Sequence, residues 1–189
     1  MNTFLKDQYP PITSAQLAQI DAYYPLTIEQ FPGTGAYWRA LANAYGDMRY
    51  MCPGLYISSA YSNAWQRTWN YHYDVQDPAQ VAQGLGVPHT VEVNAIWGPE
   101  YVTGTPPASY STSLNEGIVR IMQGYWTSFI RAHDPNVYRA EGTPVWENFW
   151  AQKMNRIRFE TNGTVMETVD PVLKEHCSYF WSIGLSLHQ

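Results

Sequence analysis

The stretch Gly86-Val87-Pro88-His89-Thr90-Val91-Glu92-Val93-Asn94-Ala95-Ile96-Trp97-Gly98 places one histidine between a Gly–Pro turn and an apolar run that ends in glycine. Proline fixes its own φ angle and favours an extended conformation in the residue before it, so we expect His89 on a rigid loop. Catalytic groups often lie on such loops, and an imidazole can change its charge near neutral pH. An isolated histidine is more often a structural or surface residue, so its neighbours decide the interpretation.

This segment resembles the catalytic-histidine segment of the type-B carboxylesterases, the family that includes cholinesterases and several secreted lipases. There, a Gly-x-x-His is followed three residues later by an acidic residue and then by an apolar run ending in Gly. Three further segments resemble family landmarks in the same order: Met51-Cys52-Pro53, residues 120–130 leading into Asp134-Pro135-Asn136, and His176-Cys177-Ser178-Tyr179-Phe180-Trp181. The resemblance covers nearly the whole chain but corresponds to about the C-terminal third of a family enzyme.

The resemblance implies an esterase mechanism, in which a serine attacks the ester carbonyl and a histidine takes the serine proton. His89 would be that histidine, because neutral imidazole is a competent base near pH 7. Glu92 corresponds to a second, buried acidic position of the family, and we assign it a supporting role. Asn115-Glu116-Gly117 is similar to the surroundings of the family's catalytic acid, but it follows the histidine, and helix capping accounts for Glu116. Family enzymes need no metal or organic cofactor, so none is expected.

The serine itself is missing, because neither Gly-x-Ser-x-Gly nor an oxyanion-hole Gly-Gly occurs in the 189 residues. In α/β-hydrolases the chain order is serine, acid, histidine. We therefore expect residues 1–189 to be the C-terminal segment of a single carboxylesterase domain, inactive without the N-terminal part. The substrate of the full-length enzyme would be a small-molecule or lipid carboxylic ester. Two alternatives stay open: a non-catalytic secreted binding module with an aromatic-rich surface, and a degenerate inactive copy.

The two cysteines, Cys52 and Cys177, could by themselves be buried free thiols. The resemblance pairs them as a family disulfide, which would require an oxidising compartment. Asn162-Gly163-Thr164 matches the Asn-x-Thr acceptor of N-glycosylation, although a hairpin turn also explains its first two residues. These features favour an extracellular protein. Residues 1–7 do not have the pattern of a secretory leader, so we expect any leader to lie outside this sequence.

Composition sets further limits. With 45% hydrophobic residues, the chain can bury a sizeable core as one domain. A net charge of -5, without long runs of one sign, disfavours nucleic acids and anionic membranes as partners. Eight Trp and fifteen Tyr fit either a core that packs against missing segments or a surface that stacks on sugars. No apolar run has the length that is needed to cross a bilayer.

The resemblance implies an α/β protein: the C-terminal part of an α/β-hydrolase fold, with an incomplete sheet, packed helices, a terminal hairpin and a C-terminal helix. A capping box at 13–16 begins a short helix, and a helical pattern covers 36–64 with a break at Pro53-Gly54. Period-two alternation at 67–74 predicts a strand that turns Trp69, Tyr71 and Tyr73 to one face and a structural His72 to the other.

Three more elements are predicted after residue 98. Residues 99–111, rich in Pro, Gly and Thr, are typical of a long loop. A second capping box at 113–116 begins a helix that continues to about residue 130. Residues 156–169 form a hairpin in which Asn162-Gly163 supplies positive φ angles, and a last helix covers about 173–187.

Overall fold

The computed structural model describes residues 1–28 and 31–188. The chain divides into two compact units, the first made of Met1–Gln66 and Val169–Gln189 and the second of Arg67–Thr168. The second unit contains a sheet and the first is built from helices, so the protein belongs to the mixed α/β class. None of the helices in the described residues is long and apolar enough to cross a membrane.

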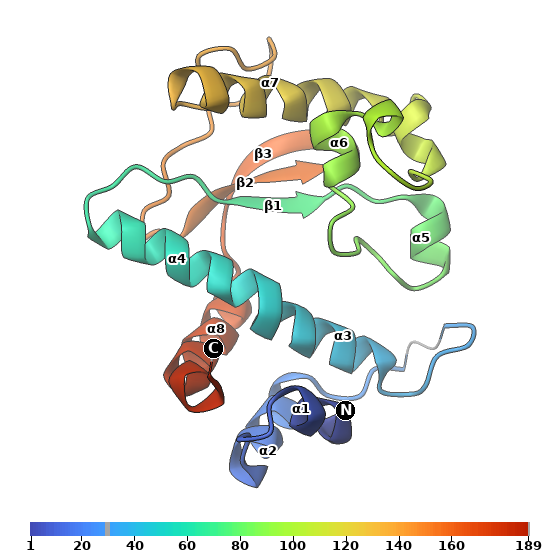
Figure 1. Cartoon of the computed structure of the whole chain (residues 1–189), viewed down its shortest axis with the longest axis vertical. Coiled ribbons are helices and arrows are strands. Elements are labelled where there is room, and N and C mark those ends of the chain that lie inside the picture. Colours follow the sequence, from blue (N-terminus) through green and yellow to red (C-terminus); the bar gives the residue numbers. More distant parts are fainter. Residues whose placement is uncertain (29–30, 189) are drawn as a thin grey trace. The chain divides into compact units, whose positions relative to one another are not determined.

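The sheet of the second unit has three strands: β1 (Tyr71–Asp74), β2 (Asn155–Glu160) and β3 (Gly163–Thr168). β1 pairs in parallel with β2, and β2 pairs antiparallel with β3, so β2 is the central strand. The register places Ile157 of β2 opposite Tyr71 of β1 and Met166 of β3. The arrows of β1 and β2 point the same way in Figure 1, with β3 returning beside them.

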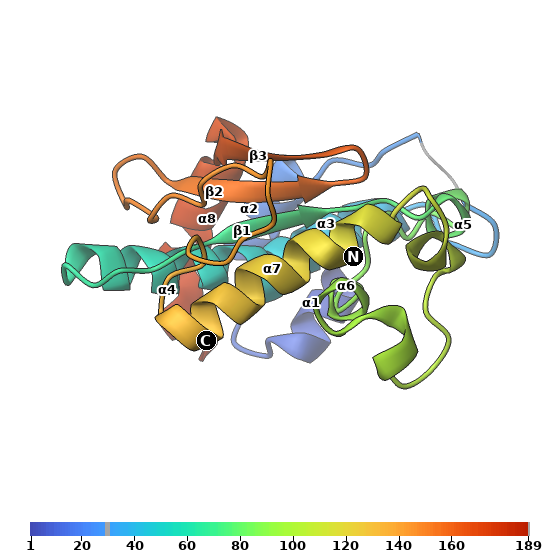
Figure 2. The ribbon, with the colours of Figure 1, turned by 90° about the horizontal axis from the view of Figure 1, so that it is seen from above.

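One face of this sheet packs against α7 (Glu116–Ala132), the long yellow helix of Figures 1 and 2. Ile157 and Phe159 of β2 share a buried cluster with Met122 and Tyr125 of α7 and with Trp146. Side chains three or four residues apart lie on one face of α7, and alternate side chains lie on one face of each strand. The hydrophobic face of the helix and that of the sheet pack against each other and form the core. The remaining buried members of this cluster are Val75, Val91, Ala95, Tyr110 and Ile118.

The predicted faces of the first strand are confirmed, but its length is not. Trp69, Tyr71 and Tyr73 pack on the core, as the alternation predicted. The ladder begins only at Tyr71, because the residues before it have partners outside β2: the Thr68 carbonyl accepts from Phe149 N, and the Asn70 carbonyl accepts from the Trp146 indole as well as from Ile157 N. On the other face His72 Nδ1 lies 3.0 Å from Glu167 Oε1 of β3. This contact between two residues of the sheet agrees with the predicted structural role of His72.

The hairpin is confirmed, whereas the predicted turn is wrong. Thr161 and Asn162 form the turn, and Gly163 already pairs with Glu160 as the first residue of β3. Neither Asn162 nor Gly163 has a positive φ angle. The turn is held instead by Thr161 Oγ1, which accepts from Gln76 N at 2.9 Å and donates to Gln76 O at 3.3 Å.

The second capping box is also wrong. Asn115, not Ser113, is the N-cap of α7, and no side-chain capping bond forms there. The side-chain NH2 group of Asn115 instead donates to Gln76 O at 2.9 Å and to Ser109 Oγ at 3.0 Å. The helix itself continues to Ala132, two residues beyond the prediction, and ends at His133 with φ 55°. The predicted loop at 99–111 contains two 3₁₀ turns, η2 (Pro99–Tyr101) and η3 (Ala108–Ser111).

The first unit is helical. Its elements are α1 (Asn2–Gln8), α2 (Ser14–Tyr23), α3 (Trp38–Gly46), the π-helical turn η1 (Asp47–Met51), α4 (Cys52–Asn63), α8 (Pro171–Gly184) and the 3₁₀ turn η4 (Leu185–Leu187). The capping box of α2 is confirmed: Gln16 N donates to Thr13 Oγ1 and the Gln16 side chain accepts from Thr13 N. The helix buries Leu17 and Ile20 as the spacing predicted.

The predicted break at Pro53-Gly54 is wrong, because the chain remains helical from Trp38 to Asn63. Proline lacks an N–H and its ring crowds the carbonyl four residues earlier. The wider π-helical turn ends at Met51, directly before α4, and leaves Pro53 in the first turn of that helix, where a missing N–H is tolerated.

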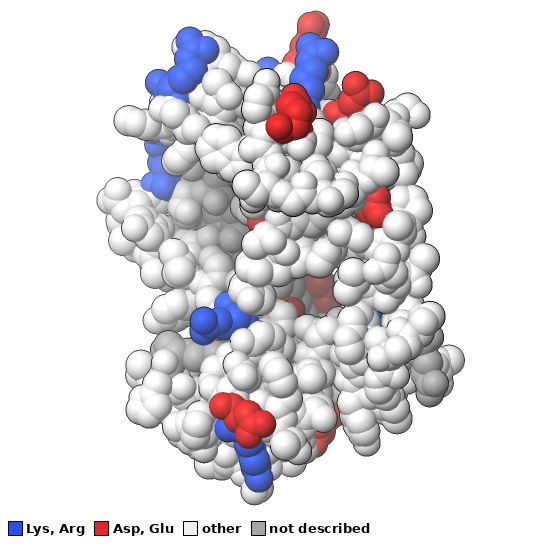
Figure 3. Space-filling model, turned by 45° about the vertical axis from the view of Figure 1, so that its right-hand side comes forward, with Lys and Arg blue, Asp and Glu red and all other residues white. Residues whose placement is uncertain are grey.

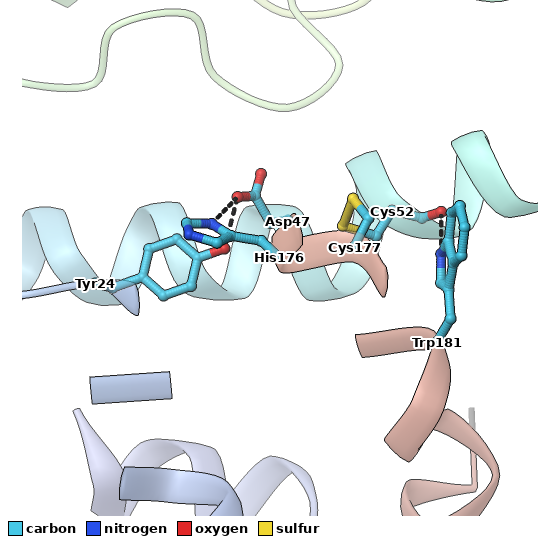
Figure 4. The surroundings of a disulfide bond; sticks show 6 residues. All are labelled: Tyr24, Asp47, Cys52, His176, Cys177 and Trp181. Atoms are coloured by element: carbon cyan, nitrogen blue, oxygen red, sulfur yellow. Dashed lines mark hydrogen bonds and ion pairs between the residues drawn. A yellow bond between two sulfur atoms is a disulfide. The ribbon is translucent and has the colours of Figure 1, made fainter. Parts of the chain in front are cut away.

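A disulfide joins α4 to α8. Cys52 and Cys177 are bonded, with their Cα atoms 5.0 Å apart, as the resemblance implied. Figure 4 shows the bond beside the Trp181 indole, which donates to Cys52 O at 3.0 Å. On the other side Tyr24 donates to Asp47 Oδ2 at 2.7 Å, and His176 Nδ1 lies 3.9 Å from the same oxygen.

Candidate functional site

His89 lies on the connection that follows the carboxyl end of β1. The chain first forms α5 (Pro78–Ala82) and then passes two glycines with positive φ angles, Gly84 at 77° and Gly86 at 64°. Such angles cost glycine little and other residues more. Pro88 then leads into a turn in which His89 is exposed. Figure 1 shows α5 and α6 (Val93–Trp97) beyond the arrowhead of β1.

The residues after His89 anchor this turn to the core. Val91 is 5% exposed and Ala95, on α6, is fully buried, and both belong to the cluster that includes Ile118 and Met122 of α7. The Asn94 side chain donates to Val91 O at 2.8 Å, which fixes the backbone between them. The arrangement holds the backbone next to His89, and His89 itself is exposed.

Glu92 is half-buried beside strand β1. Its Oε1 accepts a hydrogen bond of 3.4 Å from the Tyr71 hydroxyl. Burial and the nearby Glu92 charge raise the pKa of Tyr71 to about 12. The phenol therefore stays protonated at neutral pH and remains a donor to the carboxylate. Glu92 thus connects the turn of His89 to the sheet.

Two further tyrosines lie in the same core. The hydroxyls of Tyr73 and Tyr110 are 2.6 Å apart. Burial raises the pKa of Tyr73 far above its usual value; for Tyr110, burial outweighs the hydrogen bond from Tyr73 and raises the pKa to about 12. Both phenols therefore stay protonated near neutral pH and do not act as bases. Each hydroxyl gives the other a hydrogen-bond partner in the buried core.

Asp77 fixes the start of the same connection. Its Oδ1 accepts from the backbone N–H groups of Ala79 and Gln80, at 3.0 and 3.1 Å, and so caps α5. Burial alone would raise the pKa of the Asp77 carboxyl, but hydrogen bonds from Ser109 and from these N–H groups outweigh it and lower the pKa. A carboxylate held in this way is a capping group and not a proton carrier.

The structure brings together some of the residues predicted from the sequence. His89 and Glu92 share one turn of the second unit, and the exposed Asn162 lies in the β2–β3 turn of that unit. Cys52 and Cys177 lie in the first unit. The sequence did not predict the hydrogen bond from Tyr71 to Glu92, although the alternation had placed the Tyr71 side chain on the core face. Tyr110 had no sequence signal, because its partner is 37 residues away.

Among the described residues, no group of three or more His, Cys, Asp and Glu side chains could hold a metal ion. On the face drawn in Figure 3, basic and acidic side chains are few and scattered, and most of the surface carries neither. This face therefore presents no strong field of one sign to a charged partner.

The chain is similar to known proteins in both sequence and structure. The model of the carboxylesterase family matches residues 13–181. Secreted lipase 4 of Gibberella zeae is 26% identical over 185 residues, which are 94% of this chain and 31% of the lipase. The crystal structure of Aspergillus niger EstA is 34% identical with a TM-score of 0.90, covering 98% of this chain and 36% of EstA. The chain spans about a third of the length of each relative.

Proposed function

The chain belongs to the carboxylesterase family, and from this premise we propose that it is the C-terminal part of a carboxylic ester hydrolase with an α/β-hydrolase fold, in which it supplies the catalytic histidine, His89. The TM-score of 0.90 against a 36% portion of EstA supports this assignment of the fold. The parallel pairing of β1 with β2 also supports it, because parallel strands are typical of α/β sheets.

The observation that carries the proposal is the position of His89. It is exposed on a turn after the carboxyl end of β1, and its neighbours are anchored in the core. In open α/β sheets, ligands bind outside the carboxyl ends of the strands. A histidine at this edge, on a fixed backbone and open to solvent, has the placement that a general base needs.

In the proposed mechanism, His89 accepts the hydroxyl proton of a serine as that serine attacks the ester carbonyl. It then donates the proton to the leaving alcohol, and it repeats the cycle with water to release the acid. The serine, the acid that orients the imidazole and the oxyanion-hole donors would come from the N-terminal part of the domain. Glu92, held by Tyr71, would have a supporting role by fixing the turn.

The relatives support a proposal for the substrate and for the location. The name of the Gibberella zeae relative, a secreted lipase, supports carboxylic esters as substrates and an extracellular site of action. The Cys52–Cys177 disulfide supports the second point independently, because disulfides persist in oxidising compartments.

A chimera tests the proposal. Residues 1–189 replace the matching C-terminal portion of EstA, and hydrolysis of p-nitrophenyl acetate and butyrate is measured. We expect an active enzyme in which His89→Gln lowers kcat/KM by about 10,000-fold or more, the usual effect of removing a triad member. His133→Asn is the matched control: it is also exposed, and asparagine tolerates its left-handed φ angle of 55°.

The design separates failure of chemistry from failure of folding. A cooperative thermal melt first establishes that the chimera and both variants are folded. A folded chimera whose activity survives His89→Gln contradicts the role of His89. A folded chimera without any esterase activity favours the non-catalytic alternatives. If the chimera does not fold, the genomic sequence upstream of Met1 supplies the native N-terminal part for the same assay, and stop codons in every frame there would contradict the proposal.

A further inference from the structure

The turn between β2 and β3 carries the Asn162-Gly163-Thr164 triplet, and we propose that Asn162 is an N-glycosylation site. We further infer that the Thr164 hydroxyl serves the glycosylating enzyme and not the fold. The inference rests on the secretory route that is part of the proposed function, but not on ester hydrolysis. It concerns a modification of this chain by an oligosaccharide.

The position of Asn162 suits an attached glycan. Its side chain is exposed, and it lies in the two-residue turn at the end of the hairpin. The neighbouring Thr161 fixes this turn through its two hydrogen bonds with Gln76. A glycan at Asn162 would therefore extend into solvent from a rigid support, without displacing a buried side chain.

Thr164 provides the second, independent observation. Its Oγ1 is buried and, among the residues that the structure describes, has no hydrogen-bond partner. A buried hydroxyl without a partner is unfavourable, and valine has the same shape and an equal or greater preference for strands. The fold therefore gives no reason for a hydroxyl in β3 opposite Phe159. The acceptor triplet does, because it requires Ser or Thr two residues after the asparagine.

The burial of this hydroxyl also sets the order of events. An enzyme can reach Thr164 only in an extended chain, so transfer to Asn162 would precede folding of the hairpin. The reaction forms a bond between Asn162 Nδ2 and the anomeric carbon of an oligosaccharide, and breaks the bond from that carbon to a polyprenyl pyrophosphate. The amide nitrogen loses one proton, and the pyrophosphate leaves with the bonding electrons.

The test uses the full 189-residue chain behind a cleavable secretory leader, translated in the presence of microsomes. Four chains are compared: the wild type, Asn162→Gln, Thr164→Ser and Thr164→Val. Protection from added protease identifies the translocated chain, and a mass shift that is reversed by peptide N-glycosidase identifies the glycan. Thr164→Ser is the matched control, because it keeps a hydroxyl at the required position.

We expect the mass shift in the wild type and in Thr164→Ser, and its complete loss in Asn162→Gln and Thr164→Val. In chains made without glycan, the midpoint of thermal unfolding of Thr164→Val should equal or exceed that of the wild type. A translocated wild-type chain without the shift would overturn the glycosylation site. A lower midpoint for Thr164→Val would overturn the claim that the fold does not use the hydroxyl. A chain that the leader cannot translocate would contradict the secretory route, and none of these results depends on esterase activity.

Discussion

The Tyr71 hydroxyl donates to Glu92 Oε1 over 3.4 Å and thereby joins strand β1 to the turn that carries His89. The ring of Tyr71 is held separately, because its centroid lies 5.4 Å from that of Trp126 and 6.3 Å from those of Trp146 and Phe159. Removal of the hydroxyl should therefore change the contact with Glu92 while the aromatic packing remains.

Tyr71→Phe is expected to lower the free energy of unfolding by about 0.5–1.5 kcal/mol, the usual net contribution of one hydrogen bond. The same change should speed amide hydrogen exchange at Val93 and Asn94, whose N–H groups bond within the turn to Thr90 O and Val91 O. Urea unfolding and exchange followed by mass spectrometry measure the two effects. Tyr37→Phe, at a side chain that is 54% exposed, should change neither. Unaltered exchange in Tyr71→Phe would show that the hydroxyl does not hold the turn.

His72 gives the fold a dependence on pH. Burial, followed by the charge of Arg156, lowers the pKa of His72 below its ordinary 6.5, and Glu167 and Asp74 only partly oppose this. The folded chain therefore binds fewer protons at this site than the unfolded chain does, so stability falls as the pH drops through 6.5. Above that pH the site is neutral in both states, and its contribution no longer changes.

His72→Asn should flatten this dependence, because the amide can still donate to Glu167 but cannot take up a proton. The measurement is the free energy of unfolding in urea between about pH 5 and pH 8. The wild type should lose more stability than the variant on the acid side. Parallel curves for the two proteins would mean that His72 is not the group responsible.

The disulfide should stabilise the first unit mainly by restricting its unfolded chain. Cys52 and Cys177 are separated by 125 residues, and closing a loop of that length is worth on the order of 4 to 5 kcal/mol in the chain-entropy model. The double variant Cys52→Ser, Cys177→Ser should lose about that much free energy of unfolding, measured in urea without reductant. Added reductant should bring the wild type to the same value and leave the double variant unchanged. A wild type that is insensitive to a reductant shown to open the bond would contradict this.

Local patterns predicted the elements whose geometry is set by near neighbours. The capping box of α2 is complete within Thr13–Gln16, and the alternation of Trp69, Tyr71 and Tyr73 is enough to assign the core face of β1. The disulfide came from the family resemblance and not from the spacing of the cysteines.

The predictions that failed involve distant partners or adjustable backbone. Ser113 does not cap α7, because the helix begins only after Asn115, whose side-chain NH2 group donates to Gln76 O and Ser109 Oγ. Thr161 is in the turn because it bonds to Gln76, 85 residues away. Pro53 does not break the helix, because it lies in the first turn of α4, after a π-helical turn. The candidate site shows the same difficulty with distant partners. The sequence indicated His89, but it did not predict the hydrogen bond between Tyr71 and Glu92, which are 21 residues apart.

Two glycines on α7 should respond in opposite directions to the same substitution. A Cβ atom at Gly124 would lie 3.0 Å from the backbone nitrogen of Ala140, whereas one at Gly117 would have no neighbouring atom within 4 Å. Alanine is favoured over glycine in helices by roughly 0.5–1 kcal/mol, so Gly117→Ala, in the first turn, should gain about 0.5 kcal/mol. At Gly124 the same gain is outweighed by a contact with backbone, which cannot rotate away as a side chain could.

Gly124→Ala is therefore expected to lose about 1–3 kcal/mol, the range that is typical of overpacking. Urea unfolding of the two single variants beside the wild type measures both changes, and Gly117→Ala is the control for Gly124→Ala because it is the same substitution in the same helix. Because α7 lies close to the segment at Arg139 and Ala140, the free energy of unfolding should fall in Gly124→Ala and rise in Gly117→Ala. An equal gain in both variants would mean that this segment yields to the added methyl group and that Gly124 is not required for the packing of α7.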